Sequence, residues 1–275
     1  MRKILAFALG RVRVLIGKYL KLIKQFEFEK RKEFYLSGRD NKEFFGLNES
    51  PSDRVVYTVL TGEYDDLIPQ YYYNPKWHYI CFTDNKKLIE NGHPFWKIVP
   101  FDSEEENIAK KSRIPKILAH KFLQDYKYSL YIDANVDIIS PRIYDACENL
   151  IKRNSKMAGS IHDCRKCIYQ EMTECMILEK DDAENIARLF KKYKAENFPQ
   201  EYGLFENNVI FREHNDNDVK KLMDEWWYMV KTYSKRDQLS LMYVCWRQGF
   251  KIEKLLPLPL RLCNEDILFL EHKEN

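Results

Sequence analysis

The segment Asp133-Ala-Asn135-Val-Asp137 carries side chains well suited to chemistry, directly after the largely apolar residues 128–132. Such a run predicts a strand, which would deliver these polar side chains at its end. The i, i+2 spacing of Asp133 and Asn135 lets both lean to one face. Carboxylate and amide oxygens suit a divalent cation, and a nucleotide diphosphate could complete its ligand shell. The alternative is a polar turn, because short Asp and Asn clusters also end strands.

Two cations, Arg113 and Lys116, stand three residues apart in a segment whose apolar residues have helical spacing. That spacing predicts a helix that begins near these cations, with Pro115 tolerated in its first turn. Two cations together with the free N–H groups of a helix start suit a phosphate group. A helix start that is merely solvated is the alternative.

A polar loop is predicted after the apolar residues 157–161, and it begins at His162. In this loop Arg165 and Glu171 would face a ligand, unless the loop is plain surface. Cys164 and Cys167 form a CxxC pair beside His162, but the sequence offers no second close pair of ligands. A structural zinc site is therefore disfavoured.

Glu206 and His214 lie on either side of a strand predicted at residues 209–211. Glu206 is a candidate carboxylate for contact with an acceptor substrate. His214 is a candidate metal partner, although a histidine in such a place is more often satisfied by the structure around it.

Ser234 and Asp237 have the spacing of a capping box ahead of a predicted helix. The box would fix Asp237 and its neighbour Gln238 on the first helical turn. A carboxylate and an amide that are rigidly aimed suit a sugar-binding or catalytic site.

The elements that must position these residues alternate between strands and helices. Short apolar runs predict strands at residues 55–61, 78–83, 96–99, 128–132, 157–161 and 209–211. Alternation of this kind predicts an α/β fold with a mostly parallel sheet flanked by helices, and ligands then bind beyond the carboxyl ends of the strands. The residues that follow successive strands are Thr61, Asp84, Asn85, Asp133 and His162.

Composition sets limits on the class of protein. The chain has 275 residues, of which 45% are hydrophobic, so it can bury a full core and is not expected to be disordered. The formal net charge of +3 is too small for a nucleic-acid coat. Seven cysteines cannot all pair internally, which favours reduced thiols in a cytosol-like compartment.

The N-terminal residues 1–25 contain seven basic residues and no acidic one, interleaved with apolar side chains. This pattern predicts a basic amphipathic helix on an anionic membrane surface, or a basic helix docked on its own domain. No apolar stretch is long enough to predict a membrane span, and no small-residue cleavage site indicates a signal peptide. Residues 26–53 read as a charged linker or helix, and residues 54–275 as the globular domain.

Taken together, these segments resemble a known family. It is the glycosyltransferase-like domain, once catalogued as a domain of unknown function, of plant cell-wall proteins and bacterial polysaccharide gene clusters. The matching segments are residues 57–66, 81–85, 112–120, 130–135, 162–171, 203–206 and 226–240. They occur in the same order and cover about residues 54–250.

The resemblance implies a GT-A-like, Rossmann-type nucleotide-sugar fold, with Asp133 and Asn135 in the place of the family's metal-binding D-x-D motif. Asp237 and Gln238 look like the Asp-Gln pair of retaining enzymes of the glycogenin type, where the amide lies beneath the anomeric carbon. The resemblance implies donor binding by Thr58, Thr61, Tyr64, Asp84, Asn85, Arg113, Lys116, Asp133, Asn135, His162 and Arg165.

The chain departs from the family's pattern at the metal site. An amide at Asn135 is a weaker, neutral ligand than the usual carboxylate. Asp137 could compensate, with His214 as a further ligand, or Arg113 and Lys116 could balance the phosphate charge without metal. The late histidine of glycogenin-type enzymes has no counterpart in a matching context.

The expected function is that of a glycosyltransferase in cell-surface polysaccharide biosynthesis, such as that of lipopolysaccharide or capsule. It would use a nucleotide-sugar donor, UDP-sugar first, with Mn²⁺ or Mg²⁺, and a glycan or lipid-linked glycan acceptor. Glu206 would contact the acceptor or serve as base, and retention is inferred from Asp237-Gln238 alone. We expect a peripheral location on the inner, cytoplasmic membrane face and no nucleic-acid partner. The alternatives are a hydrolase of a lipid or nucleotide-sugar substrate, and a non-catalytic membrane-associated binding protein.

Overall fold

The computed structural model describes residues 50–62 and 67–270. The predicted helix at residues 1–25, most of the predicted linker and the candidate Tyr64 lie outside these ranges. None of the helices in the two described ranges has the length and apolar character that a membrane span requires.

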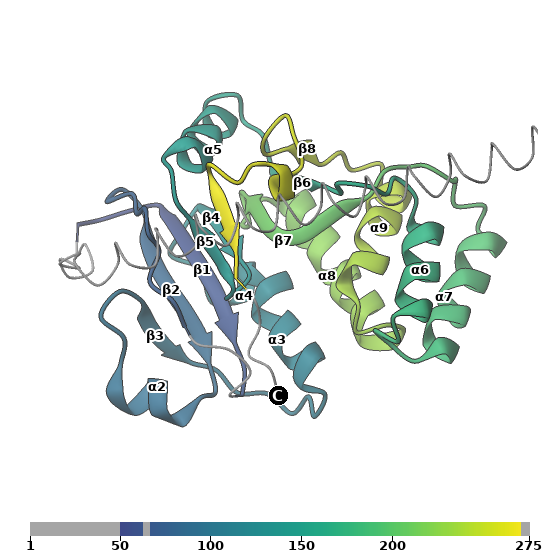
Figure 1. Ribbon diagram of the computed structural model, residues 1–275, viewed down its shortest axis with the longest axis horizontal. Helices are drawn as coiled ribbons and strands as arrows, with labels where there is room; N and C mark the ends of the chain where they lie inside the picture. The colour runs from purple at the N-terminus through teal and green to yellow at the C-terminus, as the bar shows by residue number, and fades with distance from the viewer. Residues whose placement is uncertain (1–49, 63–66, 271–275) are drawn as a thin grey trace, which may run out of the picture. The chain divides into compact units, whose positions relative to one another are not determined.

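The main sheet has seven strands in the order β3-β2-β1-β4-β7-β6-β8. All neighbouring pairs are parallel except those of β7, which runs antiparallel to β4 and β6. Figure 1 shows β1, β2 and β3 side by side as the first part of this sheet. The strands are β1 (Arg54–Leu60), β2 (His78–Thr83), β3 (Lys97–Pro100), β4 (Tyr128–Ile132), β6 (Met157–Ile161), β7 (Phe205–Arg212) and β8 (Glu253–Lys254). The fold is thus the mixed, mostly parallel α/β sheet that the sequence predicts.

Helices cover both faces of this sheet, so its central strands are buried on both sides, as parallel strands usually are. The helices are α2 (Lys86–Asn91), α3 (Ile108–Ile117), α4 (Ala119–Phe122), α5 (Arg142–Lys152), α6 (Ile168–Ile177), α7 (Ala183–Ala195), α8 (Asn217–Thr232) and α9 (Leu241–Gln248). One core joins Tyr57 and Ile210 of the sheet to α3 and to the group α6–α9, which gathers together in Figure 1. The other core joins Val56 and Phe211 to α5.

A small second sheet pairs β5 (Val136–Ile138) with β9 (Ile267–Phe269) in antiparallel fashion. It brings the end of the described chain beside the segment that follows β4. The backbone N–H of Leu270 donates to the carbonyl of Asn135 over 2.8 Å, so this contact lies two residues beyond Asp133.

The direction of β7 decides which polar residues share an edge of the main sheet. Because β7 is antiparallel to β4, its first residues lie beside the end of β4, where the N–H of Asp133 donates to the carbonyl of Asn208 over 2.9 Å. Glu206 therefore lies at the same edge as Asp133, whereas His214, after the end of β7, lies at the opposite edge. The predicted strand at 209–211 is too short, because Glu206-Asn-Asn208 breaks the apolar pattern yet pairs within the sheet.

Candidate active site

Helix α3 supplies the cations of the site, but not in the way the sequence predicts. It begins at Ile108, where the Asn107 side chain accepts from the N–H of Lys110, and it ends at Ile117. Arg113 and Lys116 therefore lie toward its C-terminal end. The expectation that helix-start N–H groups would join these cations around a phosphate is wrong.

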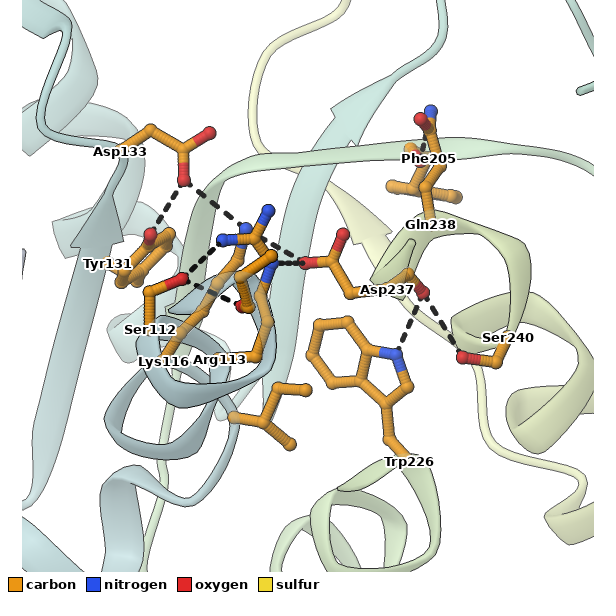
Figure 2. Close-up of polar contacts among 12 residues, drawn as sticks. Ser112, Arg113, Lys116, Tyr131, Asp133, Phe205, Trp226, Asp237, Gln238 and Ser240 are labelled. Atoms are coloured by element: carbon orange, nitrogen blue, oxygen red, sulfur yellow. Dashed lines mark hydrogen bonds and ion pairs between the residues drawn. The ribbon is translucent and has the colours of Figure 1, made fainter. Parts of the chain in front are cut away.

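The side chains of Lys116 and Arg113 meet two carboxylates that come from distant parts of the chain (Figure 2). Lys116 Nζ lies 2.9 Å from Asp237 Oδ2 and 3.2 Å from Asp133 Oδ1. Arg113 Nε lies 3.5 Å from Asp237 Oδ2, and its Nη1 donates to Ser112 Oγ over 3.0 Å. We call Arg113, Lys116, Asp133 and Asp237 the charge cluster.

Burial and charge act on the cluster in opposite directions. Burial would raise the pKa of Asp237, but Lys116 and Arg113 outweigh it and lower that pKa to about 2. Burial would lower the pKa of Arg113, yet Asp237 and Asp133 raise it above its ordinary value. The cluster thus joins two basic and two acidic side chains, whose formal charges cancel.

The loop that carries Asp237 is fixed by contacts other than the predicted capping box. Asp237 begins a 3-10 helix, η1 (Asp237–Leu239), and its carbonyl accepts from Trp226 Nε1 over 3.0 Å. Ser234 Oγ instead accepts from the N–H of Arg236 over 3.1 Å and donates to Asp181. The capping-box prediction is wrong, because Asp237 turns its carboxylate inward to Lys116.

Gln238, the predicted partner of Asp237, is fixed to the main sheet. Its Nε2 donates to the carbonyl of Phe205, the first residue of β7, over 3.2 Å. Asp237 and Gln238 thus lie at the start of β7, on the edge that also holds Asp133 (Figure 2).

Asp133 and Asn135 each use one polar side-chain atom for contacts within the protein. Asp133 Oδ1 accepts from Tyr131 Oη over 2.6 Å, in addition to its contact with Lys116. Asn135 Nδ2 donates to the carbonyl of Leu270 over 2.9 Å. Within residues 50–62 and 67–270, Asp133 Oδ2 and Asn135 Oδ1 have no hydrogen-bond partner. These two oxygens fit the chemistry of a divalent-cation site.

The other two predicted metal ligands are not brought to Asp133. Asp137 is fully buried in β5, where its Oδ1 accepts from the N–H of Tyr71 over 2.8 Å. His214 is fully buried at the opposite edge, and its Nε2 lies 2.8 Å from the carbonyl of Leu123. Burial lowers the pKa of His214 to about 4, so it stays neutral at physiological pH. Both side chains thus bind backbone groups of the fold.

The predicted nucleoside-binding residues gather where β1 and β2 end. Asp84 Oδ1 accepts from the N–H of Gly62 over 2.7 Å, and Asn85 Nδ2 donates to the Gly62 carbonyl over 3.1 Å. Lys111, which the sequence analysis did not single out, lies 2.9 Å from Asp84 Oδ2. Thr58 and Thr61 are both buried in or directly after β1.

The polar loop after β6 is an internally paired group. Arg165 Nε lies 2.5 Å from Glu171 Oε2, and His162 Nδ1 accepts from the N–H groups of Cys164 and Arg165. In the described part of the chain, one group of three His, Cys, Asp or Glu side chains has ligand atoms within 4.8 Å of one another, and it is His162, Asp163 and Cys164. Cys167 is buried at the start of α6 and takes no part in that group.

Glu206 is paired with a residue that sequence reasoning missed. Arg261 Nε lies 2.6 Å from Glu206 Oε1, and Asn208 Nδ2 donates to Glu206 Oε2 over 3.0 Å. Arg261 lies in η2 (Leu260–Leu262), and its guanidinium also stands 4.8 Å from the Phe269 ring centroid. Arg261 is a lone charge in a Leu- and Pro-rich segment, and this is the sequence feature that could have indicated its role.

Comparisons with known proteins address the family and the fold. No curated protein matches the chain. Core-mannan synthase A (CmsA/Ktr4) from Aspergillus fumigatus, in a Mn/GDP form, is 12% identical, covers 74% of this chain and 72% of that chain, and has a TM-score of 0.44. The mannosyltransferase Ktr4p from S. cerevisiae is 11% identical, covers 74% and 68%, and has a TM-score of 0.40. The apo WbbM bifunctional glycosyltransferase is 13% identical, with 77% of this chain but only 40% of that chain covered, at a TM-score of 0.44.

The family comparison is the decisive one. The description TOD1/MUCI70, glycosyltransferase-like domain, matches residues 81–263, which is well over half of the chain. The matched range contains the whole charge cluster and both residues that follow β2. The resemblance seen in the sequence is confirmed: the chain belongs to the TOD1/MUCI70 glycosyltransferase-like domain family.

Proposed function

We propose that this protein transfers a sugar from a nucleoside-diphosphate donor to a glycan or lipid-linked glycan acceptor. The charge cluster carries the proposal, because four ionised side chains from three distant segments meet at the carboxyl edge of β4. An isolated structural ion pair would not need two cations and two carboxylates at the edge where α/β sheets bind ligands. Membership of a glycosyltransferase-like family supports the same function.

The charge balance of the cluster supports a metal-dependent reaction. Asp237 and Asp133 already neutralise Lys116 and Arg113, so these cations alone leave no surplus to balance a diphosphate. Asp133 and Asn135 would hold Mn²⁺ or Mg²⁺ through their unpaired oxygens. When bound, the cation would supply positive charge to the departing diphosphate.

The side chains of the chain itself would hold and orient the donor. Two of the three N–H donors of Lys116 face carboxylates, and the third would face a phosphate oxygen of the donor. Arg113 retains donors of its planar guanidinium for the same purpose. Asp237 and Gln238 would face the reacting sugar, which in the related Asp-Gln pairs accompanies retention of anomeric configuration. Arg261 and Asn208 orient the Glu206 carboxylate, which would accept a hydrogen bond from an acceptor hydroxyl through a remaining lone pair.

Calorimetry with UDP and with GDP, each with and without Mn²⁺, tests the proposal. We expect one nucleotide to bind, and to bind at least about tenfold more tightly with Mn²⁺ because charge is then balanced. Asp133→Ala should remove that metal-dependent gain. The matched control is Asp218→Ala, which removes a carboxylate that pairs with Lys156 on the surface at 2.7 Å and should leave binding unchanged.

A product assay separates the remaining alternatives. Sugar should leave the donor faster when oligosaccharide or lipid-linked acceptors are added than in water alone. Equal rates with water as sole acceptor would identify a hydrolase instead. Failure of the wild-type protein to bind either nucleotide, with or without Mn²⁺, would identify a non-catalytic member of the family.

A further inference from the structure

The carbonyl oxygen of Lys116 receives two buried donors. The Tyr57 hydroxyl donates to it over 2.8 Å, and Arg212 Nη2 donates to it over 2.7 Å. Arg212 Nη1 also donates to the carbonyl of Ile117, the last residue of α3, over 3.2 Å. The last carbonyls of a helix lack intrahelical donors, and a cation beside them also interacts favourably with the helix dipole. Arg212 therefore fixes the end of α3 to β7.

Burial and hydrogen bonds hold the guanidinium of Arg212 in this position. Arg212 is fully buried, and its Nη2 also donates to the Tyr57 hydroxyl. In the described part of the chain it pairs with no carboxylate, so its hydrogen bonds go to a phenol, to the Met223 sulfur and to the two carbonyls. Burial raises the pKa of Tyr57 to about 12 although Arg212 opposes the rise, so Tyr57 remains a hydroxyl donor at neutral pH. Burial of a cation without a carboxylate partner is costly, so these hydrogen bonds are needed to offset its desolvation.

The other end of Lys116 lies in the charge cluster. Its ammonium stands 4.8 Å from the Tyr131 ring centroid and contacts both carboxylates, and the whole residue is 1% exposed. A side chain so enclosed cannot compensate for a displaced backbone by choosing another rotamer. Any shift at the end of α3 would therefore move the ammonium relative to Asp133 and Asp237.

We propose that Arg212 is a positioning residue, which holds the backbone of Lys116 so that its ammonium meets the donor diphosphate. This inference rests on the proposed function. It assigns no contact with substrate to Arg212, which acts through Lys116 from the opposite end of that residue. Tyr57 assists it through the same carbonyl.

A double-mutant cycle on nucleotide binding tests the inference. Arg212→Met removes the donors and the charge but keeps an unbranched apolar stem, and it is combined with Lys116→Met. The readout is the Kd of UDP and of GDP with Mn²⁺, together with the melting temperature of every variant. We expect Arg212→Met to weaken binding about tenfold in the wild-type background, and less than about twofold when Lys116 is already methionine.

A control variant and a second variant at the same carbonyl complete the test. Arg54→Met removes an arginine that is only partly buried and pairs with Glu148 at 2.9 Å at the far end of β1, and it should leave the Kd unchanged. Tyr57→Phe removes one donor with little change in volume, so it serves the same cycle if Arg212→Met does not fold. Equal losses in both Lys116 backgrounds, or no loss in the wild-type background, would overturn the inference. Failure of the wild-type protein to bind nucleotide would instead remove the proposed function itself.

Discussion

The ionisation of the Asp237 carboxylate depends on two neighbouring cations that come from another segment of the chain. The residue is nearly buried, and without Lys116 and Arg113 its charge would be unfavourable there. Conversely, Lys116 is enclosed and needs a carboxylate beside it. The charged form of each side chain is therefore stable only because the others are present. Removing one charge should destabilise the charged forms of the rest.

The pKa of Asp237 gives a prediction for stability against pH. Its folded value of about 2 lies below its ordinary value of 3.8, so its contribution is present above pH 3.8 and is lost as pH falls toward 2. By linkage this contribution is about 2 kcal/mol. Asp237→Asn should lose at least that much stability at neutral pH and should show a shallower loss of stability between these two pH values. Urea unfolding across this range measures both, and parallel curves for the two proteins would contradict the assignment.

Sequence reasoning found some members of the site and missed others for a physical reason. Asp133 stood out because it directly follows an apolar run, and Asp237 stood out through a capping pattern that the structure does not form. Arg212 donates to a backbone carbonyl 96 residues away, and Arg261 pairs with a carboxylate 55 residues away, which is one of 42 acidic residues in the chain. Only the fold selects these partners among the many that the sequence offers.

At the scale of elements, Asn135 ties the metal-site segment to the small sheet. Its amide donates to the carbonyl of Leu270, directly after β9, and a carboxylate could not make that bond. This contact gives a structural reason for an amide, rather than an acid, at position 135. Compared with an acid, Asn135 lacks a negative charge at the proposed metal site but forms a hydrogen bond to the segment that follows β9.

Asn135→Asp should separate the two effects. Loss of the donor, with a carboxylate left facing a carbonyl, should lower the free energy of unfolding by about 1–2 kcal/mol. The added charge should at the same time tighten Mn²⁺-dependent nucleotide binding. Asn135→Ala is the control, because it should lose the tether without gaining charge and should therefore weaken both properties. If Asn135→Asp bound nucleotide less tightly at every Mn²⁺ concentration, Asn135 would not be a metal ligand.

Local sequence patterns predicted some of the helices and strands and missed others. Apolar runs predicted the central strands, because burial on both faces leaves little room for polar residues. The start of α3 was missed because Ile108 is exposed and the first turn lacks an apolar stripe, although Asn107 is a good capping residue. The strands β5 and β9 escaped notice because three residues are too few to show a period.

At the scale of the whole molecule, the proposed donor chemistry rests on the described residues, and the prediction of membrane association rests on the sequence of residues 1–25. The basic segment at residues 1–25 predicts attraction to anionic lipid. A lipid-linked acceptor would then reach an enzyme already concentrated at the same surface. Deletion of residues 1–25 should therefore release the protein from vesicles that contain anionic lipid, as measured by co-sedimentation, while nucleotide binding in solution should persist.

Charge substitutions show whether electrostatic attraction causes the association. Changing Lys18, Lys21 and Lys24 to Gln should reduce partitioning roughly a hundredfold, since each basic residue near an anionic surface contributes about 1 kcal/mol. The matched control changes two exposed lysines of α2, Lys86 and Lys87, and should have little effect. Because the attraction is screened, added salt should weaken binding of the wild-type protein in the same way. Partitioning that ignores both the triple substitution and salt would mean that these lysines do not hold the protein at a membrane.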